Sequence, residues 1–253
     1  GTQSDFTFTL HNEIAGTEFI AGNPFMTHID IQQFLALNPE VSAVRIDRQN
    51  GSSTIITLID GVLAGTNGIE TSIAPMQSFF ASATVTSRTL NVYYSETMLK
   101  QEPTASAAQN LKQLSGTATQ LKKGMMQISL TVSGQTSGCL LYQSGNAKNS
   151  AANGEDVYYM YDSEIAANAA IYSITDKKAL AIQKFNNLNK IGLGMTVRNG
   201  KQGTMTLKYN SSWRNWILID KLTDKKYTLT GNSLKITVDN LSSNSNRFYL
   251  QKQ

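Results

Sequence analysis

The sequence predicts an all-β protein built from two β-sandwich domains, of the jelly-roll or immunoglobulin-like kind, with one short helix in the first domain. Apolar and polar residues alternate with a period of two in many short segments, which is the pattern of strands with one buried face. Asn-Gly and Asp-Gly dipeptides stand between several of these segments and favour tight hairpin turns. With 40% hydrophobic residues, a chain of 253 residues can bury a core in each domain.

In the first part of the chain we expect the alternating segments to pair as antiparallel hairpins. Turn dipeptides separate them at Asn50-Gly51, Asp60-Gly61 and Asn67-Gly68. The β-branched content of the segments agrees with strand formation. The segments span residues 6–10, 44–47, 54–59 and 90–93.

The short helix is expected at residues 31–37. Asp30 can cap its first turn, and Pro39 stops it shortly after its last residue. Its apolar residues fall on one face: Ile31, Phe34 and Leu35.

A polar stretch at residues 100–123, rich in Ser, Thr, Gln and Lys, separates the two domains. It can bury little apolar surface, which favours a linker. We place the boundary near residue 115, so the domains span residues 1–115 and 116–253. In the second domain the strands are expected at 126–132, 204–209, 216–220, 234–238 and 247–250, with a helical candidate at 162–168.

Histidine and cysteine are scarce: the chain has only His11, His28 and Cys139. These residue types carry most acid–base catalysis near neutral pH, much nucleophilic catalysis and most transition-metal binding. We therefore predict a protein that is not an enzyme and that uses no cofactor and no metal. Cys139 sits in an apolar run and is expected to pack in a core. His28-x-Asp30 resembles part of a metal site, but a site needs three or four ligands, so a loop histidine is favoured.

The sequence gives no sign of a nucleic-acid partner or of a transmembrane segment. The net charge of +4 is interpreted as spread thinly, because Lys and Arg cluster only in pairs such as 122–123, 177–178 and 225–226. Phosphate binding needs a basic stripe. No apolar run approaches the roughly 18 residues of a membrane span, so we expect no transmembrane segment.

Four acidic residues form the densest carboxylate cluster: Glu155, Asp156, Asp162 and Glu164. Carboxylates in turns can bind calcium. Their spacing lacks the Asp-x-Asp-x-Asp-Gly rhythm of a dedicated calcium loop, so they are weak calcium candidates and a turn region is favoured.

Aromatic residues offer a weak candidate for a ligand-binding site. Trp213 and Trp216, with Tyr209 nearby, could form a platform on which sugars stack. A spacing of three within one strand points the two Trp side chains to opposite faces, so at least one is expected in the core. A second group, Tyr158, Tyr159 and Tyr161, also falls on both faces. Core packing or a protein interface is favoured over a lectin site.

Two proline turns are interpreted as structural. Gly22 can adopt φ values closed to other residues, and Pro24 fixes its own φ and extends Asn23, so the three residues make a rigid exit from a strand. Pro75 suits the start or edge of a strand. Gln77 is expected to hydrogen-bond the backbone of its turn, in preference to a ligand.

These turns lie in two segments that resemble a paired signature of large cell-surface proteins of Bacteroidetes. The segments read Phe19-Ile20-Ala21-Gly22-Asn23-Pro24-Phe25-Met26 and Ile73-Ala74-Pro75-Met76-Gln77-Ser78-Phe79-Phe80. The second half is similar to the β-sandwich module that often closes those proteins, through runs such as Ile217-Leu218-Ile219-Asp220 and Arg247-Phe248-Tyr249-Leu250. The resemblance implies an exported, surface-attached protein of the outer membrane or extracellular space. The resemblance implies no catalytic residues in this chain.

The function we expect is non-catalytic: adhesion, or structural presentation of binding surfaces, toward a host or neighbouring-cell protein or glycan. The alternative is a carbohydrate-binding module of a surface protein that handles glycans. A concave face with exposed aromatic residues would favour the alternative, and exposed strand edges with a polar convex surface would favour the first. A hydrolase is a weaker third hypothesis, because it needs two facing carboxylates in a cleft.

Overall fold

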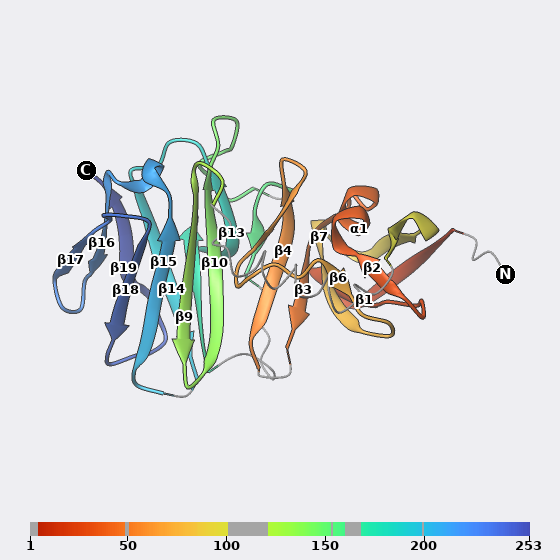
Figure 1. Ribbon diagram of the computed structural model, residues 1–253, viewed down its shortest axis with the longest axis horizontal. Helices are drawn as coiled ribbons and strands as arrows, with labels where there is room; N and C mark the ends of the chain where they lie inside the picture. Colours follow the sequence, from red (N-terminus) through yellow and green to blue (C-terminus); the bar gives the residue numbers. More distant parts are fainter. Residues whose placement is uncertain (1–4, 49–50, 101–120, 153, 160–167, 199) are drawn as a thin grey trace, which may run out of the picture. The chain divides into compact units, whose positions relative to one another are not determined.

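A computed structural model describes residues 5–48, 51–100, 121–152, 154–159, 168–198 and 200–253, and it confirms the all-β prediction (Figure 1). The chain divides into two compact units. The first contains Gly1–Ile46 and Ile55–Gln120, and the second contains Asp47–Thr54 and Leu121–Gln253. The predicted boundary near residue 115 lies outside the described residues, as does the helical candidate at 162–168 apart from Asn168.

The first unit combines a large sheet, a small sheet and a helix. The large sheet has the strand order β1 (Phe6–Gly22), β7 (Ser78–Tyr94), β3 (Val41–Asp47), β4 (Ser53–Ile59) and β5 (Val62–Gly65). The small sheet has the order β6 (Ser72–Ile73), β2 (His28–Asp30) and β8 (Leu99–Lys100), with the short 3-10 helix η1 (Glu96–Met98) just before β8. One hydrophobic core contains side chains from both sheets and from the helix α1 (Ile31–Leu37).

The helix begins and ends as the sequence predicts. The Asp30 carboxylate accepts hydrogen bonds from the backbone amides of Gln32 at 2.8 Å and Gln33 at 3.1 Å, which is an N-cap. Its apolar face, formed by Ile31, Phe34 and Leu35, is buried.

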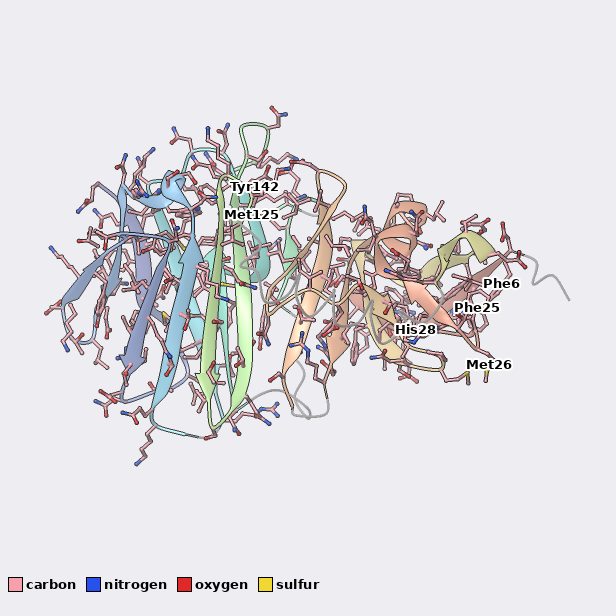
Figure 2. The ribbon with its side chains drawn as sticks, viewed as in Figure 1. Phe6, Phe25, Met26, His28, Met125 and Tyr142 are labelled. Atoms are coloured by element: carbon pink, nitrogen blue, oxygen red, sulfur yellow. The ribbon has the colours of Figure 1, made fainter. Side chains whose placement is uncertain are left out.

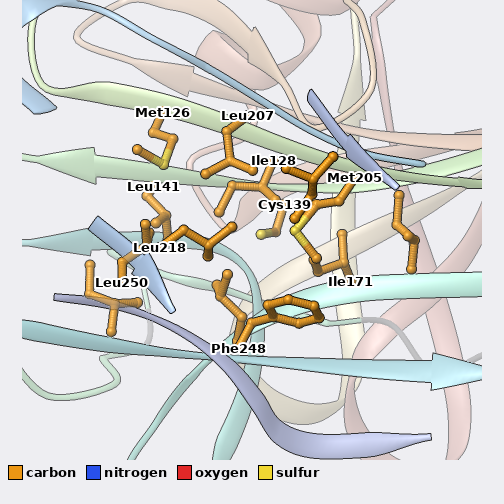
Figure 3. Close-up of a cluster of buried hydrophobic side chains, with 14 of the residues drawn as sticks. Met126, Ile128, Cys139, Leu141, Ile171, Met205, Leu207, Leu218, Phe248 and Leu250 are labelled. Carbon is orange, nitrogen blue, oxygen red and sulfur yellow. The ribbon is translucent and has the colours of Figure 1, made fainter. Parts of the chain in front are cut away.

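The second unit is a single large sheet that curls around its own core. Its strands follow the order β17-β16-β19-β14-β12-β13-β10-β9-β15-β18, and β11 pairs with β13 beside this path. Side chains from strands along the whole path meet in one hydrophobic cluster (Figure 3). The bounds are β9 (Met125–Val132), β10 (Gln135–Gln143), β11 (Val157–Tyr158), β12 (Ala169–Thr175), β13 (Lys178–Phe185), β14 (Lys190–Val197), β15 (Gly203–Tyr209), η2 (Ser211–Trp213), β16 (Trp216–Asp220), β17 (Lys225–Thr228), β18 (Ser233–Val238) and β19 (Asn244–Lys252).

Cys139 packs inside the core of the second unit, as the sequence predicts. Its side chain is fully buried, and burial raises the pKa of the thiol to about 12. The thiol is therefore protonated at neutral pH and is a poor nucleophile.

Several hairpin turns contain residues in the left-handed region. Asp60 and Gly61 both have positive φ, 51° and 77°, as a tight Asp-Gly turn requires. Asp176 and Lys177, between β12 and β13, have φ of 52° and 64°. Lysine is an unfavourable residue in this conformation because its Cβ crowds the backbone.

We predict that Lys177→Gly stabilises the second unit by about 1 kcal/mol, because glycine adopts the left-handed conformation without this crowding. Thermal melting would measure the change. Lys208→Gly is the control, since Lys208 is an exposed residue within β15, where glycine should be destabilising. Equal melting-temperature shifts in the two variants would contradict the prediction.

Candidate functional site

The paired turns of the first unit, residues 23–27 and 73–77, are joined by a set of side-chain hydrogen bonds. The Asn23 side chain links them: the two hydrogens of its amide nitrogen are shared among the carbonyl oxygens of Thr27 at 2.8 Å, Ile73 at 3.1 Å and Ala74 at 2.9 Å. Its amide oxygen accepts from the Phe25 backbone at 2.9 Å. Asn23 is 2% exposed, and its bonds to Ile73 and Phe25 are buried.

Gln77 completes the arrangement by bonding the backbone, as expected from the sequence. Its side-chain oxygen accepts from the Ala74 amide at 2.9 Å, and its own carbonyl accepts from the Asn23 amide at 3.0 Å. The Gln77 amide also donates to the Ala74 carbonyl at 3.1 Å, which closes a four-residue turn.

Two sequence predictions about these turns are wrong in detail. The Gly22 backbone lies outside the left-handed region, and a Cβ there would meet only the Gln77 carbonyl at 3.9 Å, an ordinary contact. Pro75 occupies the turn after β6 and lies in no strand. Pro24 follows Asn23, two residues after the end of β1, where its fixed φ leads the chain into the turn. The rigidity of the exit therefore comes from the Asn23 hydrogen bonds together with the prolines, and not from a glycine conformation.

The paired turns carry two exposed methionines. Met26 is 83% exposed and Met76 is 70% exposed, while Phe25, next to Met26, is buried against Phe6 and Tyr94 (Figure 2). Met76 has a φ of 58° and follows Pro75 at the third position of its turn. That position favours glycine when φ is positive, so methionine is held there at a conformational cost.

Exposed apolar residues concentrate in the first unit. Of the large hydrophobic side chains exposed within the described residues, only Leu222 belongs to the second unit. Those of the first unit are Phe8, Ile14, Ile20, Met26, Leu37, Val62, Ile69, Met76 and Val85.

The aromatic residues that were the weak candidate for a sugar platform, Trp213, Trp216 and Tyr209, are core residues. Trp213 is 1% exposed, Trp216 2% and Tyr209 3%. The 3-10 helix η2 ends at Trp213 and β16 begins at Trp216, so the two rings do not share a strand and both point into the core, 5.1 Å apart. Core packing, the interpretation that the sequence favoured, is therefore confirmed for these three residues, and the weaker sugar-platform candidate is excluded because no ligand can reach buried rings.

The acidic cluster is also used for structure. Asp156 is 4% exposed, and its two oxygens accept from the backbone amides of Ala152 at 2.8 Å and Lys184 at 2.7 Å. Burial raises the pKa of Asp156 more than these amides lower it. Glu155 accepts from the Lys148 amide at 2.9 Å, and Asp162 and Glu164 lie outside the described residues.

Among the described residues, no group of three or more His, Cys, Asp and Glu side chains is placed to hold a metal ion. His28 stands 3.3 Å from the Ser72 hydroxyl, and Asp30 caps α1 and forms an ion pair with Lys100 at 3.2 Å. The His28-x-Asp30 pair therefore belongs to the small sheet and the helix cap.

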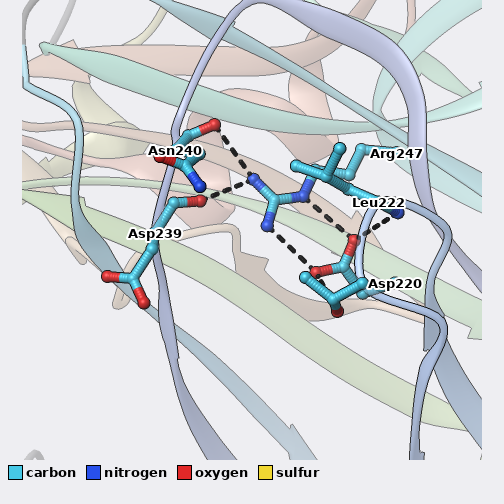
Figure 4. Close-up of polar contacts among 6 residues, drawn as sticks. Asp220, Leu222, Asp239, Asn240 and Arg247 are labelled. Atoms are coloured by element: carbon cyan, nitrogen blue, oxygen red, sulfur yellow. Dashed lines mark hydrogen bonds and ion pairs between the residues drawn. The ribbon is translucent and has the colours of Figure 1, made fainter.

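A buried ion pair that the sequence analysis did not identify ties β16 to β19 (Figure 4). The Arg247 guanidinium donates to the two Asp220 oxygens at 3.0 and 2.9 Å, and also to the carbonyls of Asp239 and Asn240. Burial raises the pKa of Asp220, but Arg247 and the Leu222 amide outweigh it, so the pKa is lowered. The sequence does contain a signal for this pair, because Asp220 and Arg247 each stand next to an apolar strand segment.

No family model matches the sequence, and no curated protein and no solved structure matches it. In the part of the chain that the structure describes, no helix is long and apolar enough to cross a membrane. The resemblance to Bacteroidetes surface proteins therefore stays a prediction.

We predict that Asn23→Ala destabilises the first unit by about 2 to 4 kcal/mol, because it leaves buried carbonyl and amide groups without partners. Gly22→Ala is the control and should change the free energy of unfolding by less than about 0.5 kcal/mol, since its backbone and space tolerate a methyl group. Urea denaturation measures both. A large loss in Gly22→Ala would contradict this account of the turn.

We predict that Asp220→Asn destabilises the second unit by about 3 kcal/mol at pH 7, because it leaves the Arg247 charge buried without a counter-charge. A lowered carboxylate pKa stabilises the fold above the unfolded pKa of 3.8, and this contribution is lost as the pH falls through the lowered value. The difference between wild type and variant should therefore shrink when urea denaturation is repeated near pH 3. The exposed Asp224→Asn variant is the control and should show little change at either pH.

Proposed function

We propose that this chain is an exported, non-catalytic protein of the bacterial cell surface that acts in adhesion, with the paired turns of the first unit as its contact surface for a protein partner. One observation carries the proposal: two neighbouring turns, held together by Asn23, present Met26 and Met76 to solvent, and Met76 occupies a position that favours glycine. Strain kept at an exposed position is typical of functional sites.

The chemistry of methionine suits this role. Its side chain is unbranched, flexible and polarizable, so it fits apolar surfaces of varied shape. The Asn23 and Gln77 hydrogen bonds fix the backbone beneath it, and a rigid backbone lowers the entropy lost on binding. The turns therefore combine a rigid backbone with flexible, exposed methionine side chains.

Three of the described aspartates are engaged in structural hydrogen bonds. Asp156, Asp220 and Asp30 each accept from at least one backbone amide, which supports a binding function over a catalytic one. The alternative, a carbohydrate-binding module, loses its predicted platform because Trp213 and Trp216 are buried.

We predict that Met76→Gly stabilises the first unit by about 0.5 to 1 kcal/mol and weakens partner binding by at least ten-fold. The purified chain would first be tested on an array of extracellular-matrix proteins and glycans, with hydrolysis assays on the same glycans. The variant is then compared with wild type on each protein that binds saturably.

Lys177→Gly is the matched control, because it also relieves a positive φ but lies in the second unit. It should leave binding unchanged. Unchanged binding in Met76→Gly would remove the paired turns from the contact surface, and measurable glycan hydrolysis would overturn the non-catalytic proposal.

A further inference from the structure

The charges of this chain are divided between its two parts, contrary to the even spread expected from the sequence. Residues 1–120 carry 5 Lys and Arg against 10 Asp and Glu, whereas residues 121–253 carry 17 against 8. The net charge of +4 therefore conceals an acidic first part and a strongly basic second part. Such asymmetry indicates that the second unit attracts polyanions.

One outer face of the second unit gathers several of these basic residues. The strand registers place Lys226, Ile219, Tyr249 and Gly192 opposite one another across β17, β16, β19 and β14. Their sequence neighbours Leu218, Phe248 and Ile191 belong to the core, so this row faces away from it. We call it the Tyr249 face.

Two lysines converge on the Tyr249 ring. The Lys190 ammonium lies 4.2 Å from the ring centroid and the Lys221 ammonium lies 5.4 Å from it, which are cation–π distances. Both side chains are exposed. The ring thus holds two positive charges close together on the surface.

These charges are not neutralised by the described part of the chain. Neither Lys190 nor Lys221 forms an ion pair with a described carboxylate. Asp220 precedes Lys221, but its carboxylate is buried and held by Arg247 at 2.9 Å. The Tyr249 face therefore presents a positive potential to solvent.

This row places a further lysine at a distance from Tyr249, and next to Tyr249 it has a position without a side chain. Neighbouring strands lie about 4.8 Å apart, so Lys226 stands about 10 Å from Tyr249. Gly192, beside Tyr249, has no side chain, and a Cβ there would meet nothing closer than Ile174 at 3.7 Å. A long polymer can approach the backbone at this point.

We propose that the Tyr249 face binds an acidic polysaccharide, a linear sugar polymer with sulfate or carboxylate groups. The positive groups are single lysines at intervals across strands, which suits a polymer with regularly spaced anionic groups. This activity goes beyond the proposed adhesion through the paired turns and uses a different unit of the chain.

Nucleic acids and anionic lipids fit this face less well. Single-stranded nucleic acids bind by stacking bases on accessible aromatic rings. The Lys190 and Lys221 ammonium groups lie against the Tyr249 ring, where a base would have to stack. The basic residues of the face are lysines, which lack the planar fork with which arginine binds phosphate. A membrane surface favours exposed apolar side chains beside the charges, and Leu222 is the large one exposed among the described residues of this unit.

The test measures binding of the full chain to dextran sulfate and polygalacturonate at low salt, with uncharged dextran as the neutral control. Binding to at least one of the two anionic polymers, weakening as salt rises and absent with dextran, supports the proposal. The double variant K190Q/K221Q should bind about ten-fold more weakly. The control K208Q/K235Q removes the same charge from exposed lysines of β15 and β18 and should change affinity less than about two-fold.

Thermal melting of both double variants shows whether they remain folded, and Y249F, which keeps the ring, should bind like wild type. Equal losses in the two double variants would overturn the proposal, because they indicate a diffuse charge effect. Tighter binding to duplex DNA or to phosphatidylglycerol vesicles would also overturn it. K190Q/K221Q should keep the protein binding that Met76→Gly weakens, so failure of one proposal is distinguishable from failure of the other.

Discussion

Backbone groups that leave a β-ladder must find partners, and this constraint determines how the polar side chains of this protein are used. A buried amide or carbonyl without a partner is costly, and a chain of short strands has many strand ends. Asn23 serves three carbonyls and one amide in the first unit. Asp156 serves two amides in the second unit, and Asn38 joins the end of α1 to β7. The loops are held by these side chains.

Several described side chains that are capable of chemistry have structural roles. Asp30, Asp156 and Asp220 accept hydrogen bonds from backbone amides, and Cys139 is buried and protonated. Exposed features then distinguish the two units. The first unit presents apolar tips, including the strained Met76, whereas the second presents lysines gathered on Tyr249. The two proposed binding surfaces therefore differ in chemistry and belong to different units of the chain.

The distribution of charge and the positions of the aromatic residues are two features that local sequence patterns did not predict. The even charge inferred from scattered lysine pairs overlooked that acidic residues are concentrated before residue 121. Lys190, Lys221 and Tyr249 are far apart in sequence and meet only because β14, β16 and β19 are neighbours in the sheet. The spacing of Trp213 and Trp216 assumes a single strand, but the 3-10 helix η2 ends at Trp213 and the strand β16 begins at Trp216. Periodicity assumes an unbroken element, and a turn breaks it.

The sequence by itself determined the all-β class, the helix Ile31–Leu37 with its Asp30 cap, the packing of Cys139 and the backbone role of Gln77, because alternation, capping and local turn chemistry act over a few residues. Only the tertiary structure decided that Asn23 joins turns fifty residues apart, that Asp220 and Arg247 pair in the interior, and that Lys190 and Lys221 share one ring. Strand order determines these contacts, and strand order depends on how distant segments bury their apolar faces together, which no local pattern records.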